Sequence, residues 1–121
     1  MGGIGEQVSW ITECAVKDGQ EEAFRTLMEE LVTSTREEPG TLGYEWYVSD
    51  DGSVVHLLER FADSEAAVAH LQGFLSGPAR KFMSCVEVKR FTVYGAPSDA
   101  AKEALAPLGG KQLVPWGGFV R

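Results

Sequence analysis

A chain of 121 residues with a formal net charge of −7 has room for one domain with one modest hydrophobic core. Its acidic balance, without any Lys/Arg cluster, excludes the basic surface that binding to nucleic acid or to an anionic membrane requires. No apolar window reaches the roughly 18 residues of a membrane span. The opening residues lack the basic start and apolar core of a signal peptide, so we expect a cytoplasmic protein. Cys14 and Cys85 are then expected to be reduced and inert.

The first half of the chain predicts a strand, a helix and a second strand. Residues 7–16 alternate as a β-strand does, and one face carries Val8, Trp10, Thr12 and Cys14. A helix follows with Asp18 as its expected N-cap, and Pro39-Gly40 ends it. Its apolar residues recur at helical spacing: Phe24, Leu27, Met28, Leu31 and Val32. The next strand, about residues 42–48, carries three aromatic residues: Tyr44, Trp46 and Tyr47.

The second half begins with a hairpin signal, Ser-Asp-Asp-Gly, which leads into a strand over residues 53–62. Asp63 is the expected cap of a second helix. Gly73 and Gly77-Pro78 are expected to break that helix and to start a short third one over residues 79–84. A fourth strand covers residues 86–95.

The resulting order, β-α-β-β-α-β, predicts an α+β fold of the ferredoxin-like kind, a four-stranded antiparallel sheet with helices on one face. The other face is expected to carry some of seven apolar residues: Ile11, Tyr47, Val55, Leu57, Phe61, Phe91 and Val93. Such an apolar surface is too large to leave in water, and a second copy of the sheet is its simplest cover. We therefore expect a homodimer.

We expect a single domain over residues 1–121, with a core at 7–95 and a C-terminal extension at 96–121. Within the extension, the sequence predicts a helix that Ser98 caps and Pro107 ends, followed by an edge strand at about 111–114. Trp116 and Phe119 are too apolar for a loose end. The sequence therefore predicts that both aromatic side chains are buried and that this tail docks, either on its own chain or on the partner subunit.

Three stretches carry a resemblance to a known family: "EEPGTLGYEWYVS", "HLLERFADSEAAVAHL" and the strand at 86–94. Together they resemble the antibiotic biosynthesis monooxygenase family of dimeric α+β barrels. The resemblance implies a homodimer with facing sheets and a ligand pocket between sheet and helices. The family includes cofactor-independent monooxygenases that oxidise quinols or aromatic polyketides with dioxygen, haem-degrading enzymes, and proteins of unknown activity. The haem-degrading branch has an Asn, a Trp and a haem-ligating His at the positions that correspond to Thr12, His70 and Arg80 here, so this sequence does not match that branch.

His70 is the candidate catalytic residue. Helical spacing places it on the inward side of its helix with Ala67, Leu71 and Phe74. The family resemblance adds a role as the base that deprotonates a phenolic substrate, which makes the substrate electron-rich enough to reduce dioxygen. The alternative is a histidine at the helix edge that hydrogen-bonds a backbone carbonyl.

Six residues are candidates for substrate binding: Trp10, Thr12, Tyr44, Trp46, Phe74 and Phe82. Tyr44 and Trp46 share one strand face and are expected to line a flat pocket, whereas Tyr47 points the other way, toward the dimer interface. The alternative is that all three aromatic residues belong to the core. Glu59 and Arg60 are expected to form ordinary ion pairs.

No spacing supports a metal site. His56 lies in mid-strand and is expected to be a hydrogen-bonded sheet histidine, and no carboxylate pattern joins it to His70. Neither a flavin nor a nicotinamide motif is present. The sequence therefore favours a monooxygenase without metal or organic cofactor that acts on a quinol or polycyclic phenol. The alternative is a non-catalytic small-molecule binding or stress-response protein with the same fold.

Overall fold

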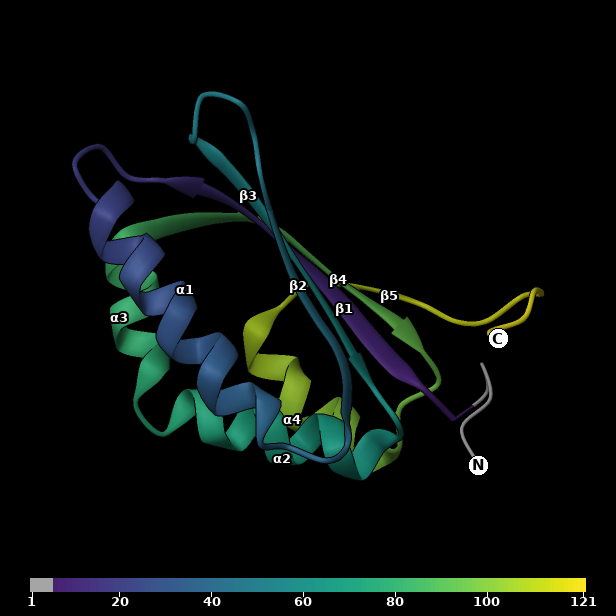
Figure 1. Cartoon of the computed structure of the whole chain (residues 1–121). Coiled ribbons are helices and arrows are strands. Elements are labelled where there is room, and N and C mark those ends of the chain that lie inside the picture. Colours follow the sequence, from purple (N-terminus) through teal and green to yellow (C-terminus); the bar gives the residue numbers. More distant parts are fainter. Residues whose placement is uncertain (1–5) are drawn as a thin grey trace.

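All helices lie on one face of a single sheet, so the protein has two layers (Figure 1). The computed structural model describes residues 6–121, and the expectation for the opening residues falls mostly outside that part. The elements are β1 (Val8–Val16), α1 (Glu21–Arg36), β2 (Thr41–Val48), β3 (Val54–Phe61), α2 (Ser64–Leu75), α3 (Pro78–Cys85), β4 (Val86–Gly95), α4 (Asp99–Leu105), the short 3₁₀ helix η1 (Ala106–Leu108) and β5 (Lys111–Leu113). No helix in this range is long and apolar enough to cross a membrane.

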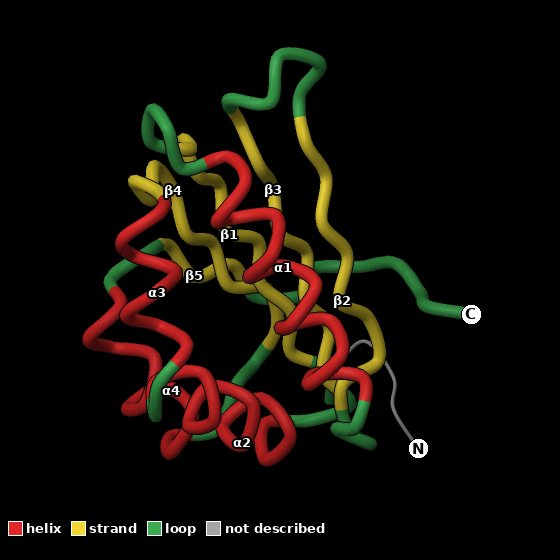
Figure 2. Tube along the Cα trace, turned by 60° about the vertical axis from the view of Figure 1, so that its left-hand side comes forward, coloured by secondary structure: helices red, strands yellow, loops and turns green. Residues whose placement is uncertain are grey.

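The strand order is β2-β3-β1-β4-β5. The first four strands pair antiparallel, and this confirms the ferredoxin-like α+β fold. The short β5 pairs parallel with β4, from Thr92 opposite Lys111 to Tyr94 opposite Leu113. Figure 2 shows the helices in front of the sheet. β2 and β5 are thus the edge strands, and a side chain on the helix-facing side of β3 or β1 lies in the middle of the domain.

Local signals fixed most helix boundaries, with two exceptions. The Asp63 carboxylate accepts a hydrogen bond from the Ala66 N–H, and the Ser98 hydroxyl accepts one from the Ala101 N–H, so both predicted caps are confirmed. Asp18 is not a cap. It lies inside a turn closed by the Gln20 N–H and the Lys17 carbonyl, and α1 begins only at Glu21. Gly73 also does not break its helix, because α2 continues to Leu75.

The strand register decides which apolar residues form the core. Val55, Leu57, Phe61 and Val93 are all buried on the helix-facing side, so they do not belong to the bare face of the sheet. Phe91 is also on the inner side, against the ring of Trp10. Of the seven candidates for the outer face, only Ile11 and Tyr47 lie there, paired with Leu58 and His56. Alternation alone yields two sets of residues, and only the tertiary fold selects the buried one.

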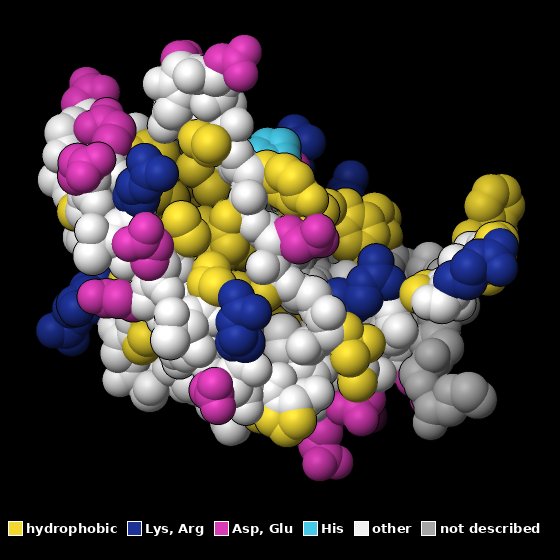
Figure 3. All heavy atoms as spheres, in the orientation of Figure 1, with side chains coloured by type: hydrophobic (Ala, Val, Ile, Leu, Met, Phe, Trp, Pro, Cys, Tyr) yellow, Lys and Arg dark blue, Asp and Glu magenta, His cyan; other side chains and the backbone are white. Residues whose placement is uncertain are grey.

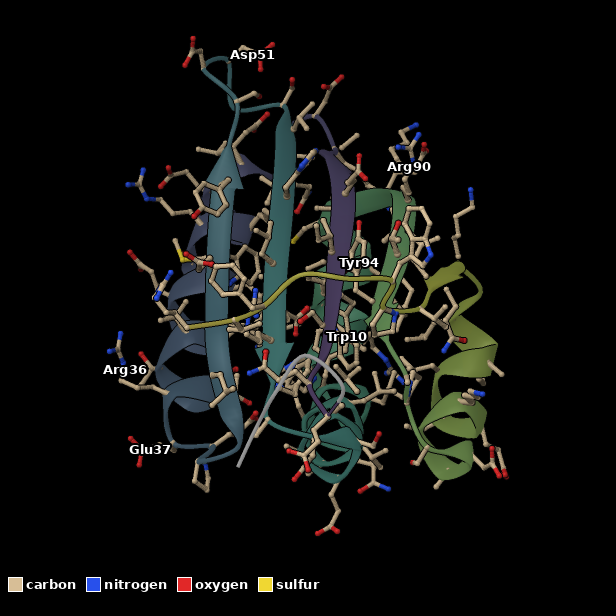
Figure 4. All side chains as sticks on the ribbon, turned by 90° about the vertical axis from the view of Figure 1, so that its right-hand side faces the viewer. Trp10, Arg36, Glu37, Asp51, Arg90 and Tyr94 are labelled. Atoms are coloured by element: carbon tan, nitrogen blue, oxygen red, sulfur yellow. The ribbon has the colours of Figure 1, made fainter. Side chains whose placement is uncertain are left out.

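Residues 114–121, here called the C-terminal arm, extend away from the domain beyond β5 (Figure 1). Trp116 is 102% exposed and Phe119 is 75% exposed, so neither is buried against its own chain, and their burial against a partner subunit stays a prediction. Figure 4 shows the arm passing in front of the outer face of the sheet, near Tyr94. The pairing of β5 with β4 directs the arm outward, and it therefore makes its apolar side chains available to another surface.

Candidate functional site

A cavity of about 360 Å³ lies between the inner face of the sheet and the helices. This volume falls in the usual range for small-molecule sites. Six predicted site residues meet here: Trp10, Thr12, Tyr44, His70, Phe74 and Phe82. The remaining lining residues are Leu57, Glu59, Leu71, Met83, Val88, Phe91, Pro107 and Leu108. The wall is therefore almost entirely apolar and aromatic, with one charged group on the sheet.

Trp46 is the one predicted site residue that the structure does not bring into this cavity. Its ring packs between Phe24 and Phe82, at centroid distances of 5.6 and 6.4 Å. It lines a different hollow of about 380 Å³ between α1 and the β2–β3 hairpin, where Figure 3 shows apolar side chains at the surface. The indole Nε1 of Trp46 is buried and has no hydrogen-bond partner among the described residues.

His70 lies between two carboxylates. Its Nδ1 is 2.8 Å from Oε1 of Glu38, and its Nε2 is 2.8 Å from Oε1 of Glu59. The side chains of His70 and Glu59 are only 7% and 6% exposed, whereas that of Glu38 is 34% exposed. The three groups therefore form a row from the surface to the cavity. Glu59 is at the cavity end, although His70 also lines the wall.

Three separate elements hold this row in place. Glu59 is on β3, where it pairs with Tyr44 of β2 and Trp10 of β1. His70 is on the buried side of α2 with Ala67 and Leu71, as its helical phase predicted. Glu38 lies in the turn before β2, and the Thr41 hydroxyl donates to its Oε1 at 2.8 Å.

Gly40 is what lets that turn approach α2. A Cβ at this position would lie 2.5 Å from the Cβ of Ala66, a distance that real Cβ atoms do not tolerate. Glycine therefore permits the close contact that brings Glu38 to Nδ1 of His70. The Pro-Gly pair that ends α1 in the sequence thus also positions one member of the site.

Opposing effects set the protonation of His70. Burial lowers its pKa, but the hydrogen bonds and charges of Glu59 and Glu38 together raise it above the ordinary value. Both ring nitrogens of a histidine donate only in the imidazolium form, and carboxylates only accept. The geometry is therefore that of an imidazolium between two carboxylates. Burial, followed by the charge of Glu59, raises the pKa of Tyr44, so this phenol stays neutral beside the pair.

The roles of Glu59 and Glu38 were missed in the sequence, where Glu59 was assigned to an ordinary ion pair. One signal was present: Glu59 shares its strand phase with Val55, Leu57 and Phe61, and a charged residue in a buried row needs a partner. For Glu38 no such signal exists, because its partner is 32 residues away in the chain.

The remaining candidates lie apart from this cluster. His56 is on the outer face of the sheet, where its Nε2 is 3.6 Å from a carboxylate oxygen of Glu13, so the sheet separates it from His70. Cys14 and Cys85 are both buried free thiols. Burial raises the pKa of Cys14 to about 12.

An apolar cavity with one buried acid–base pair, enclosed by a ferredoxin-like α+β domain, has the features of a small-molecule site. The sequence profile described as antibiotic biosynthesis monooxygenase matches residues 8–79, and the chain belongs to this family. The match confirms the resemblance seen in the sequence. It stops before α4 and the rest of the C-terminal extension. No curated protein matches the chain.

Several solved structures share the fold. MupZ from Pseudomonas fluorescens superposes with a TM-score of 0.85 at 20% identity, over 97% of this chain and 91% of MupZ. Rv0793 from Mycobacterium tuberculosis has a TM-score of 0.63 at 29% identity, over 77% of this chain and 96% of its own. SnoaB from Streptomyces nogalater, described as a cofactor-independent oxygenase, has a TM-score of 0.64 at 16% identity, over 77% and 95%. MupZ thus matches a larger share of this chain than the other two.

Proposed function

We propose that this protein is a monooxygenase that oxidises a quinol or a polycyclic phenol with dioxygen, without a metal or an organic cofactor. The observation that carries the proposal is the buried Glu59–His70 pair at an apolar cavity. Membership of the family supports it. The description of SnoaB, which shares this fold, as a cofactor-independent oxygenase also supports it.

The first step in the proposal is removal of a phenolic proton. Oε1 of Glu59 faces Nε2 of His70, and Glu59 also lines the cavity. A phenol that enters the cavity meets this carboxylate, which takes the proton and becomes a carboxylic acid. The substrate is left as a phenolate. A well-placed general base contributes about 10²–10⁴-fold to a rate.

The second step is oxidation of the phenolate. It gives one electron to dioxygen, and the resulting superoxide and phenoxyl radical combine into a peroxide at carbon. Cleavage of the O–O bond leaves one oxygen atom on the substrate, and the other oxygen departs as water. One hydrogen of this water is the proton held by Glu59, so the carboxylate is regenerated. The second hydrogen is the other one that the substrate loses. The apolar wall keeps bulk water away from the peroxide.

In this mechanism His70 acts through Glu59. The sequence pattern and the family resemblance indicate His70 itself as the base, but both of its ring nitrogens face carboxylates. An imidazolium cannot accept a further proton. It instead orients Glu59 and balances the buried charge, and Glu38 holds the opposite side of the ring. We therefore assign proton transfer to Glu59 and a positioning role to His70.

Oxygen uptake tests the proposal. The chelator-treated protein is given a panel of hydroquinones, dihydroxynaphthalenes and anthrones, and oxygen consumption is compared with that of buffer. We expect enzyme-dependent uptake with one oxygen atom incorporated into the product, detected by mass spectrometry with ¹⁸O₂. Tight binding of panel members without uptake would contradict the proposal and would favour the alternative, a non-catalytic binding protein.

The outer face of the sheet supports a second part of the proposal, a homodimer. Tyr47 is 54% exposed on this face. A hollow of about 470 Å³ lies between the face and the C-terminal arm; its apolar lining includes Ile11, Leu58, Tyr94, Leu113, Phe119 and Val120. A second copy would cover both the face and the arm. We place the dimer in the cytoplasm, in line with the expectation from the sequence.

A further inference from the structure

We infer that the segment Ala106–Gly110, here called the cap, limits the size of the aromatic compound that the cavity accepts. The inference rests on the proposed function for the class of ligand, a planar phenol. It concerns residues outside the part of the chain that the family profile matches. Pro107 and Leu108 of the cap line the same cavity as Glu59 and His70, although they come from the C-terminal extension.

The exposed fractions of the lining residues show where the cavity opens. Glu59, His70 and Trp10 are almost completely buried, so they form its inner part. Met83 of α3 is 50% exposed and Leu108 of the cap is 40% exposed, so these two side chains form its rim. A phenol whose hydroxyl reaches Glu59 must therefore direct its far ring toward Leu108 or Met83. The length available to the ligand depends on where these side chains stand.

The cap is fixed at both ends, so it is a wall rather than a moving lid. Before it, Ala101 and Leu105 of α4 are buried against the core that includes Leu71 of α2. The Ser98 N–H also donates to the Ser64 hydroxyl, which joins the start of α4 to α2. After the cap, β5 pairs with β4 from Lys111 onward. Contacts with α2 and β4 thus hold the cap on both sides.

Gly110 joins the cap closely to the cavity wall. Its φ is +111°, and a Cβ there would lie 2.6 Å from the carbonyl oxygen of Phe91 and 2.8 Å from the Cδ2 atom of the Phe91 ring. Phe91 itself lines the cavity. Any side chain at position 110 must therefore push the cap away from Phe91. At Gly109, with φ +65°, a Cβ would meet open space.

Rv0793 and SnoaB each match 77% of this chain with 96% and 95% of their own lengths, so part of this chain has no counterpart in either, whereas MupZ matches 97% of it. A selective wall added to a shared cavity is a common way to change specificity, because catalytic groups stay on the scaffold.

The test measures binding rather than turnover. Quenching of tryptophan fluorescence, for which Trp10 in the wall is the reporter, gives dissociation constants without oxygen for three probes: hydroquinone, 1,4-dihydroxynaphthalene and 1,8-dihydroxyanthrone. Leu108→Trp shortens the cavity at its rim. We expect the preference for the three-ring over the one-ring probe to fall at least about 10-fold, the scale of misfit in an apolar pocket. Leu75→Trp is the matched control, since Leu75 is 52% exposed and lies outside the cavity.

Gly110→Ala provides a second, independent variant, with Gly109→Ala as its control. We expect Gly110→Ala to weaken the binding of the three-ring probe and Gly109→Ala to leave it within about 3-fold; melting curves confirm that both variants fold. An unchanged probe preference in Leu108→Trp and Gly110→Ala overturns the inference. The same holds if no probe binds the wild type or Leu108→Ala. If only Leu108→Ala binds the three-ring probe, the side chain of Leu108 excludes this probe from the wild type and the inference stands. Size-dependent binding without oxygen uptake would refute the proposed function alone.

Discussion

Oε1 of Glu59 and Nε2 of His70 face each other at 2.8 Å in a part of the protein where both side chains are more than nine-tenths buried. Glu59 belongs to an inner strand and His70 to the helix that covers it. A buried charge without a partner is costly, so each residue needs the other. Changing either residue therefore affects both stability and the chemistry of the cavity, and the predictions below separate the two effects.

The first prediction concerns Glu59→Gln, which keeps the shape of the side chain and an oxygen that accepts from His70 but cannot take up a proton. Oxygen-dependent turnover should fall about 10²–10⁴-fold, the usual contribution of a general base. Anaerobic affinity for the phenol should change much less. Steady-state oxygen uptake and fluorescence titration measure the two quantities. The control is Glu30→Gln, at an exposed position on α1, which should retain full activity. Unchanged turnover in Glu59→Gln would rule out this residue as the base.

The second prediction is a pH dependence of stability that originates at His70. Its pKa is raised in the folded protein, because the two carboxylates outweigh burial. The protonated form therefore stabilises the fold, fully below the unfolded-state pKa of about 6.5 and progressively less as the pH rises through the raised folded-state value. His70→Gln removes this contribution. The difference in unfolding free energy between wild type and variant, from urea titrations, should be larger at pH 6 than at pH 9. A difference that grows toward pH 9 would contradict the imidazolium assignment.

The third prediction concerns Gly40, where an added Cβ would lie 2.5 Å from that of Ala66. Gly40→Ala must separate the α1–β2 turn from α2, so it should cost about 1–3 kcal/mol of stability, the scale of overpacking. It should also move Glu38 away from His70. Chemical denaturation measures the first effect, and the imidazole NMR resonances of His70 followed against pH measure the second.

Gly73→Ala is the control for this experiment and should change stability in the opposite direction. Gly73 is within α2, and a Cβ there would meet nothing within 4 Å. Alanine in a helix interior is about 0.5–1 kcal/mol better than glycine. If both substitutions change the stability in the same direction, the close contact between Gly40 and Ala66 does not explain the effect of Gly40→Ala.

The fourth prediction concerns the C-terminal arm. Light scattering at micromolar concentration should give twice the 13.2 kDa chain mass. Deletion of residues 114–121 removes the exposed Trp116 and Phe119, so it should weaken the dimer. The melting temperature of the wild type should rise with protein concentration, and that of the deletion variant should do so less. A monomeric wild type, or an identical concentration dependence, would contradict a role of the arm between subunits.

Elements that depend on neighbouring residues were predictable from the sequence. The β2–β3 hairpin follows from Ser-Asp-Asp-Gly, and in the structure the Asp51 carboxylate accepts hydrogen bonds from the Ser49 hydroxyl and from the N–H and hydroxyl of Ser53. The caps of α2 and α4 are equally local. The order of these elements was enough to predict the fold, because few topologies fit it.

The site was predictable only in part, because its main interaction connects distant residues. Helical phase placed His70 inward, and strand phase placed Tyr44 on the same side of the sheet. Neither pattern reveals that Glu38 and Glu59 approach the two ring nitrogens of His70 from different elements. The prediction for the C-terminal arm was incomplete for a related reason. Hydrophobicity indicates that Trp116 needs to be covered, but it does not say whether the cover comes from its own chain.

The burial of Cys14 has a consequence for the proposed reaction with dioxygen. The thiolate is the form of cysteine that peroxides oxidise. Burial raises the pKa of Cys14 to about 12, so the thiol is protonated at pH 7. Cys14 lies two residues from Thr12, a lining residue of the cavity, on the same face of β1, but it is not itself part of the lining. Hydrogen peroxide released into the cavity by an incomplete turnover of the proposed reaction would therefore find this sulfur both covered and protonated, and the protein would resist oxidative damage by that by-product.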